Sequence, residues 1–114
     1  MFDVALLFRT ADRNQVGTLR CVIRLEVPLG SRSYPVIVGE AALDALPSLI
    51  PEDVSRIALV TQKGINAPID TGITSSTHLI PDGEKAKSLS VVEKLCSDFA
   101  RAGLTRRDLV IGVG

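Results

Sequence analysis

The densest group of side chains able to bind a ligand lies in the run LIPDGEKAKSL, residues 79–89. Gly83 permits a tight or left-handed turn. Glu84 can accept hydrogen bonds from sugar hydroxyls, and Lys85 and Lys87 offer positive charge to phosphate. The helix expected next would add free backbone amides and the positive end of its dipole. The run is a candidate site for a phosphorylated sugar, although a solvated charged turn explains the same residues equally well.

Other polar or glycine-containing groups are weaker candidates. Gly112 and Gly114 end a predicted strand and could open a glycine-rich phosphate loop, but two such glycines more often reflect packing. His78 is the only histidine and has no neighbouring His, Cys pair or carboxylate cluster, so we expect a hydrogen-bonded or exposed strand residue and no metal site. The run 106–108 could clamp an anion, yet a solvated loop is the preferred interpretation. The same holds for Asp44, Glu52 and Asp53.

Composition excludes several classes of protein. The chain has 114 residues, which predicts one domain, and 46% hydrophobic with 23% charged residues predicts a packed core. Thirteen basic and thirteen acidic residues cancel, so no excess charge favours a nucleic acid or a membrane as partner. Aromatic residues are only 4%, which also argues against base stacking.

The cysteines and the N-terminal run predict a location. Cys21 and Cys96 lie far apart in apolar settings, and we interpret both as buried thiols in a reducing compartment. The apolar run near the start is too short to span a membrane and lacks the basic lead of a signal peptide. We therefore expect a cytoplasmic protein.

The first elements that could position the charged turn are two strands and a short helix. Residues 1–17 show no clear period and are predicted to be a loosely attached extension, with the domain occupying 18–114. Residues 18–27 alternate apolar and polar, which predicts a half-buried strand, and 34–39 predict its hairpin partner. Residues 40–50 have helical spacing but contain Pro47, so this helix should be short or kinked.

The remaining elements predict a parallel sheet. Residues 56–61 and 108–114 are continuous apolar runs typical of buried strands, and 77–80 form a shorter strand. Residues 89–103 predict a helix with a Ser90–Glu93 capping box, an apolar stripe from Leu89 to Ala100 and Gly103 as its C-terminal stop. This order predicts an α/β fold, a Rossmann-like parallel sheet with an N-terminal β-hairpin. Ligands of such sheets bind at the carboxyl ends of the strands.

Leu79 to Gly114 resembles the N-terminal NAD-binding part of the 3-dehydroquinate synthase family of sugar-phosphate cyclases. The resemblance rests on ordered motifs: a Pro-Asp-Gly-Glu turn with a lysine three places after the glutamate, a Ser-Leu helix start, AGL at the helix end, and Arg-x-Asp before a strand that ends in glycine. It extends more loosely back to about Tyr34 and does not cover 1–17.

The resemblance implies an activity and a set of cofactor contacts. The family converts 3-deoxy-arabino-heptulosonate 7-phosphate to 3-dehydroquinate with release of phosphate, an NAD-dependent carbon–oxygen lyase reaction of the shikimate pathway and aromatic amino acid biosynthesis. The NAD-binding residues implied here are Asp82, Gly83, Glu84, Lys85, Ala86, Lys87 and Gly114.

The resemblance also implies what this stretch does not supply. The family's divalent metal, zinc or cobalt, is held by a C-terminal helical domain, so no catalytic residue or metal ligand is expected in this chain. We therefore expect an N-terminal fragment that is inactive by itself. The full-length protein could be a homodimer acting on a small sugar-acid phosphate.

Two departures from the family pattern leave alternatives open. Gln62 stands where the family often has an aspartate, and 62–76 is shorter and poorer in helix formers than the family's helix. The alternatives are another sugar-phosphate cyclase, a metal-dependent polyol or alcohol dehydrogenase, and a non-catalytic nucleotide-binding module.

Overall fold

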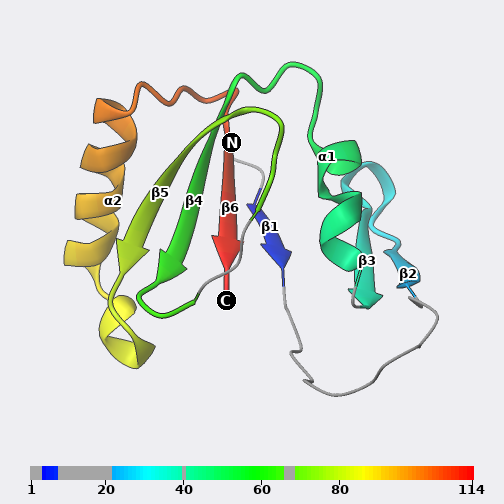
Figure 1. Ribbon diagram of the computed structural model, residues 1–114, viewed down its shortest axis with the longest axis horizontal. Coiled ribbons are helices and arrows are strands. Elements are labelled where there is room, and N and C mark those ends of the chain that lie inside the picture. Colours follow the sequence, from blue (N-terminus) through cyan, green and yellow to red (C-terminus); the bar gives the residue numbers. More distant parts are fainter. Residues whose placement is uncertain (1–3, 8–21, 40, 66–68) are drawn as a thin grey trace.

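The computed structural model describes residues 4–7, 22–39, 41–65 and 69–114 (Figure 1). Its strands are β1 (Val4–Leu7), β2 (Val22–Val27), β3 (Tyr34–Gly39), β4 (Arg56–Gln62), β5 (Thr74–Ile80) and β6 (Leu109–Val113). Its helices are α1 (Leu46–Leu49), α2 (Leu89–Arg101) and the 3-10 turns η1 (Gly30–Arg32), η2 (Ala42–Ala45) and η3 (Gly83–Ala86). In the described part of the chain no helix has the length and apolar character needed to cross a membrane.

Four strands form one parallel sheet in the order β1-β6-β4-β5, and β2 pairs with β3 in a separate antiparallel hairpin. The predicted α/β fold, with a Rossmann-like parallel sheet and an N-terminal hairpin, is confirmed. Because the strands are parallel, β4, β5 and β6 end at one edge, the lower edge in Figure 1. That edge carries the predicted ligand-binding residues.

Two features of the sheet, its first strand and the connection from β4 to β5, were only partly predicted from the sequence. Val4–Leu7, inside the segment 1–17 that was expected to be loosely attached, pairs in parallel with β6. The boundary at residue 17 stays a prediction. β4 and β5 are joined by residues 63–73, whose described part contains no helix. Thr71 is buried there, and its hydroxyl exchanges hydrogen bonds with the backbone of Ile73, which closes the short crossover.

The core lies between α1 and one face of the sheet. Leu46 of α1 packs against Ile57 of β4 and Ile111 of β6, and these three side chains are almost fully buried. The helical segment is short, as predicted, because Pro47 has no backbone N–H and is tolerated only in the first turn. This packing makes β4 and β6 the rigid centre of the sheet.

Helix α2 covers the opposite face of the sheet, beside β5 (Figure 1). Its N-cap is Ser88, whose hydroxyl accepts a 3.4 Å hydrogen bond from the Val91 N–H, so the predicted capping role of Ser90 is wrong. Gly103 ends the helix with φ of 73°, as predicted. The N–H groups of Gly103 and Leu104 bond back to the carbonyls of Ala100 and Phe99, the Schellman pattern.

The apolar patterns in the sequence identified the apolar faces of α2 and β2, but they did not predict correctly how deeply those faces are buried. On α2, Leu89 is 87% exposed and Cys96 is also exposed, so the predicted stripe is rotated and Cys96 is not a buried thiol. Cys21 lies outside the described residues. On the hairpin, Ile23 and Leu25 are 56% and 58% exposed, so β2 is not half-buried as predicted. A two-stranded sheet buries little by itself, and no described element covers this face.

Asp108 ties the amino ends of the two central strands together. Its carboxylate accepts hydrogen bonds from the N–H of Arg56, the first residue of β4 (2.9 Å), and from the hydroxyl of Ser55 just before it (3.1 Å). It also accepts from the Thr105 N–H (2.7 Å) and hydroxyl (3.0 Å). Asp108 is only 4% exposed, so the predicted solvated interpretation of 106–108 is wrong for this residue, although Arg106 and Arg107 are exposed.

These hydrogen bonds predict a pH dependence of stability. They favour the ionised carboxylate, the Thr105 N–H most strongly, and lower the pKa of Asp108 to about 2. The unfolded pKa is about 3.9, so the stabilisation is complete above that pH and is lost as the pH falls towards 2. We expect Asp108→Asn to lower the free energy of unfolding at pH 7, because its amide would face N–H donors.

The difference between wild type and Asp108→Asn should shrink between about pH 4 and pH 2, as followed by chemical denaturation at several pH values. Asp53→Asn, at an exposed residue in the loop before β4, is the matched control and should leave the profile unchanged. A gap between wild type and Asp108→Asn that stays constant down to pH 2 would contradict this role.

Candidate functional site

The charged turn follows β5 at the carboxyl edge of the sheet. Asp82 is the N-cap residue of η3, and Gly83 begins this turn with φ of 62°. This left-handed conformation was predicted from the glycine, and a side chain there would be strained. The turn directs residues 84–87 away from the strand before α2 begins at Leu89.

Glu84 and Lys87, the sharpest predicted cofactor contacts, form an ion pair with each other. The Lys87 Nζ lies 2.7 Å from the Glu84 Oε1, and the two side chains are 73% and 85% exposed, respectively. An exposed pair of this kind contributes about 0–1 kcal/mol. Both side chains can therefore be redirected to a ligand at little cost. Lys85 is exposed and Ala86 is half-buried beside them.

A groove of about 730 Å³ lies beside this turn, between the end of β5 and the first turns of α2. Asp82 is the one predicted contact that lines it. The other polar lining residues, Lys63, Ser90 and Lys94, were not predicted from the sequence as ligand contacts. The remaining walls are apolar: Leu79, Ile80, Pro81, Val91 and Leu95. Lys63 directly follows β4, so the rule that ligands meet strand carboxyl ends could have identified it.

Gly114 lies at the same edge, but not directly beside the turn. β6 is separated from β5 by β4, so Gln62 and Lys63 lie between the two predicted contact regions. A Cβ built at Gly112 or Gly114 would have no heavy-atom neighbour within 4 Å beyond the adjacent residues. At Gly112, within β6, no neighbouring side chain therefore crowds the backbone.

The chemical groups along the carboxyl edge of the sheet match those that a dinucleotide requires. The groove offers apolar walls, two ammonium groups, a carboxylate and a hydroxyl, and Gly112 leaves the backbone of β6 uncrowded. An adenosine ring needs apolar contact, ribose needs acceptors, and a pyrophosphate needs cations and N–H groups. Every one of these is present along the carboxyl edge. A ligand of this length would lie across β4, from the turn after β5 to Gly114.

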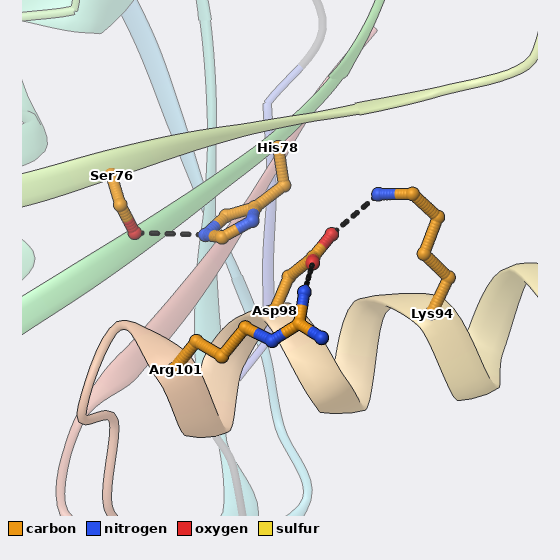
Figure 2. Close-up of polar contacts among 5 residues, drawn as sticks. All are labelled: Ser76, His78, Lys94, Asp98 and Arg101. Carbon is orange, nitrogen blue, oxygen red and sulfur yellow. Dashed lines mark hydrogen bonds and ion pairs between the residues drawn. The ribbon is translucent and has the colours of Figure 1, made fainter.

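A polar cluster separate from the groove joins β5 to α2, on the face of the sheet that α2 covers (Figure 2). The His78 Nε2 lies 2.8 Å from the Ser76 hydroxyl, and the His78 ring meets Phe99 edge-on at 5.0 Å between centroids. His78 is half-buried and hydrogen-bonded, one of the two environments that the sequence predicted for it.

Asp98 completes the residue types of a hydrolytic triad but is paired elsewhere. Its carboxylate accepts a 2.6 Å hydrogen bond from Lys94 and lies 3.9 Å from Arg101, as Figure 2 shows. The hydrogen bond from Lys94 lowers the pKa of Asp98, and the charges of Lys94, His78 and Arg101 act in the same direction. We interpret the cluster as a polar contact that fastens α2 to β5. Among the described residues no group of three His, Cys, Asp or Glu could hold a metal ion.

Comparison with known proteins finds relatives among the 3-dehydroquinate synthases. No family profile matches the chain. A 3-dehydroquinate synthase of Rhodopseudomonas palustris (strain BisA53) is 32% identical over 103 residues, which cover 81% of this chain and 27% of that protein. A 3-dehydroquinate synthase of Thermobifida fusca (strain YX) is 33% identical over 101 residues, 82% of this chain and 27% of that protein.

This chain is homologous to the N-terminal part of the 3-dehydroquinate synthases. The relation confirms the resemblance that the turn, helix and glycine strand indicated. A provisionally designated aminodehydroquinate synthase of Amycolatopsis mediterranei (strain S699) is 40% identical over 94 residues, 79% of this chain and 26% of that protein. The chain thus spans about a quarter of the length of the curated relatives it matches.

The left-handed turn at Gly83 can be tested by substitution. Gly83→Ala places a Cβ at φ of 62°, which should cost about 1–2 kcal/mol of unfolding free energy. Gly112→Ala is the matched control, because its φ is not positive and its Cβ would meet nothing within 4 Å. Denaturant titration of both variants measures the difference. Equal stabilities would show that the turn relaxes without strain.

Proposed function

We propose that the chain is the N-terminal dinucleotide-binding part of a 3-dehydroquinate synthase-like enzyme, with residues 18–114 forming the beginning of its NAD-binding domain. The observation that carries the proposal is the sequence relation to 3-dehydroquinate synthases over about four-fifths of the chain. The location of the charged turn and the glycine strand at one edge of the sheet supports it.

In this proposal NAD, when bound, supplies a reversible hydride acceptor for a ring alcohol. Glu84 opens its ion pair with Lys87 to accept hydrogen bonds from ribose, while Lys87 and Lys85 approach phosphate oxygens. Asp82 and the backbone of Gly83 and Ala86 shape the entrance to the groove. Gly114 gives the pyrophosphate access to the backbone at the end of β6.

The rest of the activity is assigned to the part of the family that this chain does not match. There the proposal places the divalent metal, zinc or cobalt, which would orient the hydroxyls of the heptulosonate phosphate. The product would be 3-dehydroquinate for aromatic amino acid biosynthesis, made in the cytoplasm, with a homodimer as the possible full-length assembly. No catalytic residue is proposed in 1–114.

A second candidate is another sugar-phosphate cyclase. It is favoured by the 40% identity to the provisionally designated aminodehydroquinate synthase, the highest identity among the relatives described above. Such an enzyme would use the same cofactor edge and differ in its substrate pocket. The synthase names of these relatives argue against a polyol or alcohol dehydrogenase, while a non-catalytic nucleotide-binding module stays an alternative.

Cofactor binding is tested by titrating the chain with NAD and following backbone amide shifts by NMR. We expect shifts at 82–87 and at Gly114, and a Kd that is raised about fivefold in Lys87→Ala, since one exposed charge contact is worth up to about 1 kcal/mol. Arg107→Ala, which removes an exposed cation from the loop before β6, is the control. The absence of shifts at both regions would overturn the cofactor assignment.

Turnover is a separate test. We expect the purified chain, supplied with NAD, zinc and 3-deoxy-arabino-heptulosonate 7-phosphate, to release no phosphate above background, because the proposal assigns the metal ligands to the unmatched part of the family. A coupled phosphate assay measures this. Sustained phosphate release by the chain would contradict the assignment of the metal ligands to the unmatched part of the family. It would not contradict the proposed cofactor site.

A further inference from the structure

One side of the β2–β3 hairpin is an apolar surface that no element in the described part of the chain covers. Residues that lie opposite each other in an antiparallel pair point to the same side. Three such pairs, all of them apolar, make up this side: Ile23 with Val38, Leu25 with Val36, and Val27 with Tyr34. We call these six residues the hairpin face. Val27 is half-buried, and the other five residues are between 38% and 58% exposed.

The other side of the hairpin is turned towards the body of the protein. Pro35 and Ile37 of β3 alternate with residues of the hairpin face and are half-buried, and β3 contacts η2. Figure 1 shows the hairpin beside α1, at the opposite end of the molecule from α2. The hairpin face is therefore directed outward and lies away from the groove between β5 and α2.

The hairpin face is large for an apolar surface left in water. Five apolar side chains that are about half exposed amount to roughly 500 Å², near the upper limit for the largest apolar patch of a typical monomer. A two-stranded hairpin is also only marginally stable by itself and needs a further layer packed on it. Both observations indicate that this face has a partner.

The chemistry of the hairpin face fits a second copy of itself. None of its six side chains carries a charge, so no charge complementarity selects a basic or an acidic partner. Two apolar sheet faces can stack about 10 Å apart, as in β-sandwiches. Two copies stacked about a two-fold axis would bury roughly 1,000 Å² in total, the smallest area expected of a specific interface. Tyr34 would add an aromatic contact of the kind that contributes most to interfaces.

We propose that the hairpin face is a self-association surface, through which two copies of this chain form a symmetric dimer with their β2–β3 hairpins stacked. Leu25 and Val36, the middle pair of the face, would lie next to the two-fold axis. The inference gives an interface to the homodimer considered above. It does not depend on the cofactor site, which lies away from the hairpin.

Sedimentation equilibrium of the intact chain, without any nucleotide, measures the dimer. We expect reversible dimers with a Kd in the micromolar range, because the buried area is at the small end for specific interfaces. The midpoint of denaturant unfolding should rise with protein concentration, because association stabilises the folded state. Isotope-filtered NOEs between labelled and unlabelled copies should join the methyl groups of Leu25 and Val36.

Two matched substitutions assign the contact to one side of the hairpin. Leu25→Glu places a carboxylate on the hairpin face and should raise the Kd about a hundredfold, since the two-fold axis repeats a tenfold loss. Val22→Glu makes a comparable change on the opposite side of the same strand and should leave the Kd unchanged. Val38→Lys repeats the test at an exposed position of β3. All three residues are exposed, so the variants should fold, and circular dichroism checks this.

Several results would overturn the inference. A monomer at every soluble concentration would do so, as would a dimer that Leu25→Glu and Val38→Lys leave intact. Equal weakening by Leu25→Glu and Val22→Glu would show that the contact is not confined to the hairpin face. Aggregates without a fixed size would show that the face is not complementary to itself. None of these results bears on NAD binding at 82–87 and Gly114, so the proposed function is tested separately.

Discussion

The buried carboxylate of Asp108 is the constraint on which the sheet depends. It accepts hydrogen bonds from the backbone N–H of Arg56 and Thr105 and from two hydroxyls, so it joins the start of β4 to the start of β6. These strands are neighbours in space but some fifty residues apart along the chain. A charge with four donors is costly to move and costly to protonate. It therefore holds the amino ends in register, with Ile57 opposite Leu109.

Because the register of β4 and β6 is fixed at their amino ends, it also determines which residues lie side by side at their carboxyl ends. In parallel strands, the pairing of Ile57 with Leu109 carries through to Thr61 with Val113 and, on the β5 side, Gln62 with Ile80. The carboxyl ends therefore finish together, and the charged turn, Lys63 and Gly114 share one edge. The site is assembled by strand geometry, which explains why Glu84 and Lys87 can stay paired and exposed. Their positions are set by the turn, and their side chains remain free to reorient.

Local signals in the sequence predicted most elements, and tertiary burial accounts for the errors. Gly83 and Gly103 were predicted correctly because a positive φ is a local requirement. Alternation correctly placed Ile23 and Leu25 on one face of β2, but alternation cannot say whether another element covers that face. Asp108 looked like part of a solvated charge run because its donors, Ser55 and the Arg56 N–H, come from a distant segment. The groove was missed for the same reason: Lys63 and Lys94 meet only after β5 and α2 have packed.

Electrostatics explain how a chain without net charge can favour an anionic ligand at one edge. Two acids close to the groove, outside its lining, are engaged with partners of their own: Asp98 with Lys94, and Glu84 with Lys87. The Glu84–Lys87 pair is exposed enough to be worth at most about 1 kcal/mol, so a phosphate that offers two or three acceptors can replace its carboxylate. Asp108, in contrast, lies at the opposite edge with each carboxylate oxygen accepting two hydrogen bonds, and it cannot be recruited. Charge that stabilises the fold and charge that is available for binding are thus separated by the length of a strand.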